Sequence, residues 1–128
     1  VKPKTFVNNS GKAINKIVSF YKIPMEKIFV FHDDMDLALS RIKIKVGGSS
    51  AGHNGIKSID MYIGKNYNRV RVGIGHSTGY LSTKNYVLEK FSKNEHNLIK
   101  EKICVLAKNI HCLLNNESNN LLNILSNA

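Results

Sequence analysis

The sequence predicts an α/β fold in which helices pack on a small sheet. Two observations lead to this prediction. Segments with apolar residues at three- and four-residue spacing are interspersed with segments that are continuously apolar or that alternate apolar and polar residues. These segments follow the order helix, strand, strand, helix, strand, helix, helix, which is typical of layered α/β structures. Because 128 residues give room for one core, we expect residues 1–128 to form a single domain.

The first half of the chain contains one predicted helix and two predicted strands. The helix begins at Ser10, carries apolar residues at helical spacing and ends before Pro24. Residues 28–31 form a continuous apolar run, which is typical of a strand covered on both faces. Residues 41–46 alternate strictly, so isoleucine and valine lie on one face of the strand and arginine and lysine on the other.

The second half contains a further strand between helices. Isoleucines stand at helical spacing within residues 56–63, and residues 69–74 alternate again. Residues 95–128 are predicted to be C-terminal helices of the same domain, with a break at Asn115-Asn116. The first of these helices carries one apolar stripe, which we expect to face the core.

The composition predicts a polyanionic partner. The formal net charge of +10 and the pI of about 9.7 favour nucleic acid over a membrane surface. A bias toward Lys and Asn explains part of this charge, but not why basic residues recur on the strand-like segments. No apolar run approaches the roughly 20 residues that span a bilayer, and no signal-peptide core is visible.

The cysteines and histidines show no metal-ligand spacing. On one helix Cys104 and Cys112 would be about 12 Å apart, beyond the roughly 7 Å that a disulfide allows. Free thiols fit a reducing compartment. The sequence therefore predicts a cytoplasmic protein that needs no metal and no cofactor.

A glycine-rich segment joins the second predicted strand to the helix after it. Gly47 and Gly52 have the spacing of a phosphate-binding loop, but His53 and Asn54 follow where such a loop needs Lys and Ser or Thr. The glycines instead let the start of the helix approach a ligand closely. Asn54 is therefore a candidate binding residue, and the alternative is that it is only the helix N-cap.

Asp33 follows the predicted buried strand, where a carboxylate is unusual unless it is paired. One interpretation is that the Asp33 carboxylate orients a histidine that acts as a general base. No Ser or Cys has the setting of an activated nucleophile, so we expect the base to activate a water molecule. The alternative is an aspartate that caps the following turn. Since His32 faces the opposite side of the strand, His53 is the best candidate partner within this chain.

Four segments, in this order, resemble the bacterial-type peptidyl-tRNA hydrolase family. They are KPKTFVNNSG at 2–11, FHDDMDL at 31–37, GGSSAGHNG at 47–55 and RVRVGIGH at 69–76. The resemblance runs from Lys2 to about Ser92. It implies a mixed sheet sandwiched between helices, with the family's first strands and first helix upstream of Val1, where the chain opens without an initiator Met. It also implies hydrolysis of the ester between peptide and tRNA during translation, by a protein that we expect to be a monomer.

The resemblance gives binding roles to single residues of this chain. It implies that Phe6 and Val7, where the family has Met, wall the peptide pocket. It implies that the amide of Asn8 hydrogen-bonds the peptide backbone, since an amide both donates and accepts; the alternative is a helix N-cap. It places Asn54 on the peptidyl part, with His53 as a neighbour in the pocket.

A second set of positions concerns the tRNA. The resemblance implies that Lys45 and Arg71 hold a tRNA phosphate, which would position the acceptor stem without reading bases. The alternative is that both lie on solvated strand faces. Residues 77–84 occupy the position of the family's lid along the chain, although their sequence differs from that of the family.

The family's general base is a histidine in an upstream His-Asn pair, and no position of this chain matches it. The resemblance therefore implies that Asp33 is catalytic through a histidine not present here, and we expect this chain alone to show little hydrolysis. The alternative function is a non-enzymatic RNA-binding relative, like the plastid intron-splicing protein of the same fold. The set Asn8, Asp33 and Asn54 argues against it, because a binding protein needs phosphate contacts rather than a pocket carboxylate. We expect Asn8, Asp33, His53 and Asn54 to share one rim of the sheet.

Overall fold

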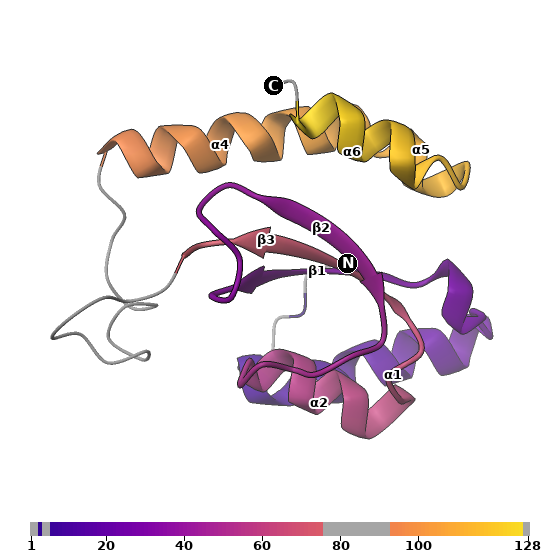
Figure 1. Cartoon of the computed structure of the whole chain (residues 1–128). Coiled ribbons are helices and arrows are strands. Elements are labelled where there is room, and N and C mark those ends of the chain that lie inside the picture. Colours follow the sequence, from indigo (N-terminus) through magenta and orange to yellow (C-terminus); the bar gives the residue numbers. More distant parts are fainter. Residues whose placement is uncertain (1–2, 4–5, 76–92, 127–128) are drawn as a thin grey trace, which may run out of the picture. The chain divides into compact units, whose positions relative to one another are not determined.

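The computed structural model describes residue 3, residues 6–75 and residues 93–126. The elements are η1 Val7–Asn9, α1 Ser10–Tyr21, η2 Met25–Lys27, β1 Phe29–Asp34, β2 Ile42–Val46, α2 Asn54–Ile63, β3 Asn68–Gly73, α4 Lys93–Lys108, α5 His111–Leu114 and α6 Ser118–Ser126 (Figure 1). The predicted order is confirmed from α1 to β3. The first predicted C-terminal helix is wrong in its length, because it ends at Lys108 and a separate helix, α5, follows before the break at Asn115. The predicted lid at 77–84 and His76 of the fourth segment lie outside the described residues. Within the described ranges, no helix has the length and apolar character needed to cross a membrane.

The three strands form a mixed sheet in the order β1-β3-β2. β1 and β3 run parallel, whereas β3 and β2 run antiparallel. The hydrogen bonds that give these directions run from Asn68 N–H to Ile28 O, Ile74 N–H to Asp34 O, Gly47 N–H to Tyr67 O and Gly73 N–H to Arg41 O. The predicted mixed α/β fold is thus confirmed.

By its internal contacts the chain forms two units. The first unit comprises Val1–His32 and Ile44–Val70, and the second comprises Asp33–Lys43 and Arg71–Ala128. Each of the three strands passes from one unit into the other. That residues 1–128 are one domain, with 95–128 as its C-terminal helices, stays a prediction.

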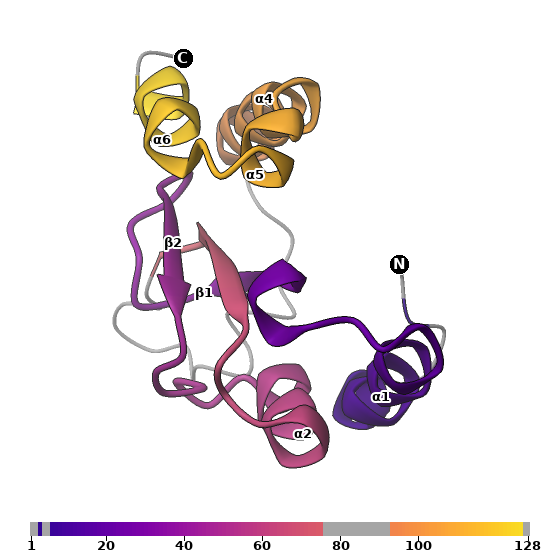
Figure 2. The same ribbon diagram turned by 90° about the vertical axis from the view of Figure 1, so that its right-hand side faces the viewer.

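In the first unit, α1 and α2 lie side by side (Figure 2). Gly11 allows this approach, because a Cβ atom at this position would lie 2.1 Å from the Ser58 carbonyl oxygen. The Gly11 N–H also donates to Ser58 Oγ at 2.9 Å. The core beneath the helices is formed by Ile28, Ile56, Ile59 and Tyr67.

In the second unit, α6 packs on both α4 and α5. The predicted apolar stripe consists of Ile99, Ile103, Leu106, Ile110 and Leu113. Of these, Leu106 and Leu113 are buried, as are Leu121 and Leu125 on α6. The prediction is wrong for two residues of the stripe, since Ile103 is 47% exposed and Ile110 is 39% exposed. The stripe therefore covers the core with only part of its length.

The two cysteines of the second unit are both free thiols. They do not share a helix, because α4 ends at Lys108 and Cys112 belongs to α5. Cys104 is exposed and Cys112 is buried.

β1 differs from its prediction at two points. The strand continues to Asp34, so Asp33 lies within it rather than after it, and Phe31 is 44% exposed instead of covered. The extension follows from the ladder to β3, in which the Asp34 carbonyl accepts from Ile74 N–H at 3.1 Å. An apolar run predicts a strand, but it does not tell whether both faces are covered.

Candidate substrate-binding site

The glycine-rich segment before α2 is a series of tight turns. Gly47, Gly48 and Gly52 have φ values of 68°, 101° and 80°, and Ala51 has a φ of 49°. Glycine adopts this left-handed backbone without steric cost, whereas other residues rarely do. The glycines are therefore required by the path of the chain into α2, whereas the close approach of a ligand to the helix start stays a prediction.

His53 is the N-cap of α2. Its Nδ1 accepts a hydrogen bond from the Ile56 N–H at 3.2 Å, so in the neutral imidazole the proton resides on Nε2. The alternative that made Asn54 the N-cap is wrong, because Asn54 is the first residue of the helix. The Asn54 amide is thus outside the capping contact, at the end of the helix where backbone N–H groups carry partial positive charge.

The first sequence segment meets the start of α2 at Gly55. A Cβ atom on Gly55 would lie 3.0 Å from Val7 Cγ2 and 2.9 Å from His53 Cε1. Phe6 and Val7 are 84% and 55% exposed, and Asn8 is exposed as well. They therefore form an open surface beside α2 rather than an enclosed pocket.

The capping alternatives for this first segment are also resolved. Asn8 lies inside η1, and Asn9 occupies the N-cap position of α1 without a side-chain cap. Ser10 is the first residue of α1, and its hydroxyl donates to the Val7 carbonyl at 2.8 Å. The N-cap interpretation of Asn8 is therefore wrong, whereas the predicted helix start at Ser10 is confirmed.

The second segment reaches the same place through His32. The His32 and His53 rings meet edge to face, with centroids 5.4 Å apart and planes at 76°. Within the first unit, residues of three segments thus gather at the start of α2. Asp33 begins the second unit, and its place beside Asn8, His53 and Asn54 stays a prediction.

Asp34, the neighbour of Asp33, contacts the turn that follows β1, and the capping alternative for Asp33 stays open. Asp34 Oδ1 accepts from the Asp36 N–H at 2.8 Å, and Asp34 Oδ2 accepts from Arg71 Nε at 2.7 Å. The Asp34 side chain is 5% exposed and that of Arg71 is 23% exposed. The alternative of a solvated strand face is therefore wrong for Arg71, whereas Lys45 on β2 is exposed as expected.

A model of the peptidyl-tRNA hydrolase family matches residues 1–128. The chain belongs to this family. The match extends over the C-terminal helices, beyond the part from Lys2 to about Ser92 in which the sequence showed the resemblance.

Individual peptidyl-tRNA hydrolases agree with this assignment. The enzyme of Rickettsia bellii is 46% identical over 117 residues, which are 91% of this chain and 63% of the relative. The enzyme of Wolbachia pipientis is 50% identical over 127 residues, which are 98% of this chain and 68% of the relative. The crystal structure of the Acinetobacter baumannii hydrolase matches 96% of this chain and 63% of its own length, with a TM-score of 0.86 and 32% identity. The chain thus spans about two thirds of these hydrolases.

Three residues with buried side chains, Tyr67, Arg69 and Asp60, were not among the predicted site residues of this hydrolase-family chain. Arg69 is 2% exposed and its Nη2 lies 2.8 Å from Asp60 Oδ1, while Tyr67 donates its hydroxyl to the same oxygen at 2.7 Å. Burial, together with the bond to the Asp60 carboxylate, raises the pKa of the Tyr67 hydroxyl well above its ordinary value. The alternation around Arg69 predicted a polar strand face, and no local pattern indicated that Asp60 on α2 would lie against Arg69.

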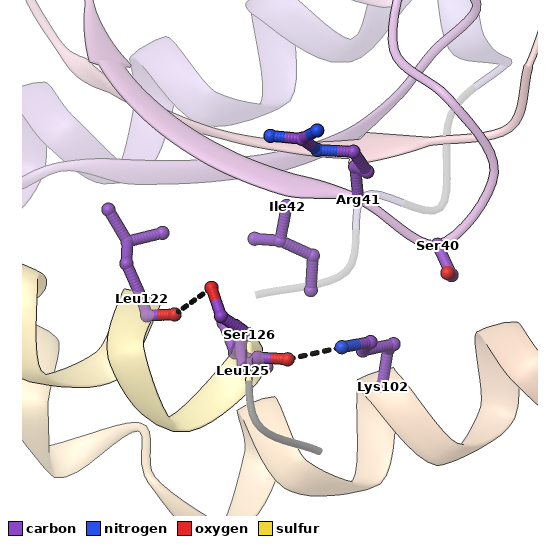
Figure 3. Close-up of a pocket in the computed structure, with 7 residues that line it drawn as sticks. All are labelled: Ser40, Arg41, Ile42, Lys102, Leu122, Leu125 and Ser126. Atoms are coloured by element: carbon purple, nitrogen blue, oxygen red, sulfur yellow. Dashed lines mark hydrogen bonds between the residues drawn. The ribbon is translucent and has the colours of Figure 1, made fainter.

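A cavity of about 370 Å³ lies in the second unit of this hydrolase-family chain (Figure 3). Lys102 Nζ donates to the Leu125 carbonyl at its edge, and Ser126 Oγ donates to the Leu122 carbonyl at 2.9 Å. None of the predicted site residues lines it. In the part of the chain that the structure describes, no group of three His, Cys, Asp or Glu side chains is arranged to hold a metal.

Proposed function

We propose that this protein hydrolyses the ester bond between peptide and tRNA in peptidyl-tRNA, and so releases free tRNA and peptide during translation. The observation that carries the proposal is the meeting of three family segments at the start of α2, through Val7, His32 and His53. Membership of the peptidyl-tRNA hydrolase family over residues 1–128 supports it. The relatives described above are all named as hydrolases, which gives no support to a non-enzymatic RNA-binding function.

The substrate's peptidyl part would bind beside the N-terminus of α2. The amides of Asn8 and Asn54 would hydrogen-bond its backbone, with Phe6 and Val7 in contact with its side chains. The N–H groups at the start of α2 would stabilise negative charge that develops on the ester carbonyl oxygen. The exposure of Phe6 and Val7 supports this role, because an apolar surface of this kind favours an apolar ligand group.

Asp33 would orient and charge a histidine base, which removes a proton from the attacking water. His53 is poorly suited to be that base. Its Nδ1 already accepts the Ile56 N–H, so its Nε2 bears the proton and donates rather than accepts. We therefore assign His53 to substrate binding and to the cap of α2.

The tRNA would bind through its phosphates. Lys45 is exposed, and Arg71 keeps donors on its guanidinium after Nε has bound Asp34, because arginine carries five. The net charge of +10 favours association with a polyanion. A monomer in the cytoplasm is part of this proposal.

The test is release of a labelled N-acetyl-amino acid from tRNA under single-turnover conditions, which detect slow cleavage. Because no position of this chain matches the histidine that Asp33 would orient, we expect slow cleavage that Asp33→Asn changes little. We expect Asn8→Ala and Asn54→Ala to weaken binding of the acylated tRNA. Asn9→Ala is the matched control, because Asn9 is exposed and makes no side-chain cap. A chain that binds acylated and deacylated tRNA equally, and never cleaves the ester, would instead be an RNA-binding relative.

A further inference from the structure

Arg69, whose side chain is buried, is hydrogen-bonded or stacked to three other groups of the first unit. Arg69 Nη2 donates to Asp60 Oδ1 on α2 at 2.8 Å, and Arg69 Nη1 donates to the Ser49 carbonyl at 2.9 Å. Tyr67 donates its hydroxyl to Asp60 Oδ1 at 2.7 Å, and its ring centroid lies 5.0 Å from Arg69 Cζ. One guanidinium thus joins β3, the second turn of α2 and the glycine-rich segment before α2.

The geometry of this network requires arginine. A guanidinium is planar and directs several donors in fixed directions, whereas the lysine ammonium is a compact charge on a flexible stem. Lysine at this position could bind Asp60 or the Ser49 carbonyl, but it could not hold both in their present places. The buried charge is costly unless it is paired, which explains why Asp60 lies against it with 8% exposure.

The Ser49 carbonyl is the point at which Arg69 reaches the turns that lead to His53. Ser49 Oγ accepts from the Ala51 N–H at 3.1 Å, and the His53 N–H donates to the Ser50 carbonyl at 2.9 Å. Ala51 has a φ of 49°, a conformation that surrounding contacts must maintain. Fixing Ser49 therefore fixes the turns that bring His53 to its capping position.

We infer that Arg69 is a positioning residue: it holds residues 47–52 so that His53 and Asn54 stand at the start of α2 in the geometry that the substrate needs. The role in the reaction rests on the proposed function, whereas the effect on the loop does not. An ordinary buried ion pair is the competing explanation. It would contribute stability to the whole unit without a particular effect on the loop.

The first experiment measures the loop without any substrate. In Arg69→Lys we expect hydrogen exchange to accelerate at the Ala51, His53 and Ile56 amides. This acceleration should be about tenfold larger than the acceleration at the Ile59 amide in the middle of α2. Tyr67→Phe is the matched control, because it removes a hydrogen bond of the same network that does not reach the loop. It should lower the melting temperature while the exchange ratio between loop and helix stays unchanged.

Asp60→Asn provides a second variant if Arg69→Lys does not fold. The asparagine oxygen still accepts from Tyr67, but the charge that fixes Arg69 is lost, so we expect a smaller acceleration at the same three amides. Exchange that rises uniformly over loop and helix in both Arg69→Lys and Asp60→Asn would overturn the inference and leave Arg69 as an ordinary buried ion pair.

The second experiment measures how well the protein distinguishes N-acetyl-phenylalanyl-tRNA from deacylated tRNA. We expect Arg69→Lys to reduce this discrimination by about 10- to 100-fold, the size of effect that a small misplacement of binding groups produces. Affinity for deacylated tRNA should stay unchanged. Arg41→Lys is the control for replacing an arginine by lysine. Arg41 is exposed, and it lines the cavity of the second unit rather than contacting the glycine-rich segment.

The outcomes separate the inference from the proposed function. If the loop loosens and discrimination falls, both are supported. If the loop loosens but the unaltered protein does not discriminate, the loop-holding role stands and the proposed function is wrong. If the unaltered protein discriminates and Arg69→Lys discriminates equally well, Arg69 does not position the substrate site.

Discussion

Arg71 and Asp34 form an ion pair in which Nε and Oδ2 are 2.7 Å apart, on two strands that are neighbours in the sheet. The other Asp34 oxygen accepts from the Asp36 N–H at 2.8 Å. One oxygen of the Asp34 carboxylate therefore holds the Arg71 side chain, and the other holds the turn that follows β1. An arginine held in this way presents its remaining donors in a defined direction, which is an advantage for binding a phosphate.

Changing Lys45 and Arg71 to alanine together should weaken tRNA binding and make it less dependent on salt. Each phosphate contact that is lost should reduce the slope of log affinity against log salt by about 0.7 to 0.9, because fewer counterions are released. Fluorescence anisotropy with labelled tRNA at several salt concentrations measures this slope. Lys65→Ala is the control, since Lys65 is an exposed lysine outside the candidate sites. A double variant with the same slope as Lys65→Ala would show that neither residue contacts phosphate.

His53→Ala should destabilise the protein through the loss of the α2 cap. Removing a side-chain N-cap typically costs about 0.5 to 2 kcal/mol, because a backbone N–H loses its partner. His53→Asn should restore most of this stability, since asparagine is a favourable N-cap, although it cannot replace the ring contact with His32. Urea unfolding followed by circular dichroism compares the variants. Equal stability of the alanine and asparagine variants would contradict the capping role.

Gly11→Ala should be among the more damaging single-methyl additions in the first unit. The added Cβ would lie 2.1 Å from the Ser58 carbonyl oxygen and 2.8 Å from the Ile59 nitrogen, so α1 and α2 would have to separate. Overpacking of this kind typically costs about 1 to 3 kcal/mol. Lys12→Ala, on the exposed neighbouring residue, should change the free energy of unfolding little. A Gly11→Ala protein as stable as Lys12→Ala would exclude the close helix approach.

The free energy of unfolding should decrease as the pH rises above about 10, which is the pKa of a tyrosine in the unfolded chain. Tyr67 is the residue responsible. Burial and the Asp60 carboxylate raise the pKa of Tyr67 in the folded state well above that value. Between the two pKa values the unfolded chain binds fewer protons than the folded protein, so the free energy of unfolding decreases by up to about 1.4 kcal/mol for each pH unit. The tyrosine contribution is complete below pH 10 and is lost above it.

Urea unfolding at pH values from 9 to 11 checks this dependence. The variant Tyr67→Phe is the comparison, because it keeps the ring and lacks the ionisable hydroxyl. Subtracting its pH profile leaves the contribution of the Tyr67 hydroxyl alone. Identical profiles for the two proteins would rule out the raised pKa.

The elements of the fold could be predicted because each has a local pattern. The helix at Ser10 and the strand at residues 42–46 follow from periodicity alone. The partners of the basic residues on β3 could not be predicted in this way. Asp34 and Asp60 reach Arg71 and Arg69 only after the strands pair and α2 packs, and nothing in a one-dimensional pattern distinguishes a paired arginine from a solvated one.

In the candidate site, too, the features that depend on local sequence could be predicted and those that depend on tertiary contacts could not. The glycines before α2 correctly indicated a chain path that other residues rarely adopt, because backbone conformation depends on the local sequence. The choice of His53 over Asn54 as the N-cap depended on which side chain turns back toward Ile56. The His53 ring also contacts His32, which is distant in the sequence, and a local pattern does not contain this contact.

The unequal exposure of the two cysteines has a practical use. Cys104 is exposed on α4, whereas Cys112 is buried beneath α6 with 3% of its surface accessible. A maleimide dye should therefore attach to the native protein at Cys104 alone, without any engineered cysteine. Modification of Cys112 would then require the helices of the second unit to open, so the rate of the second labelling event reports the opening of α4, α5 and α6 under native conditions.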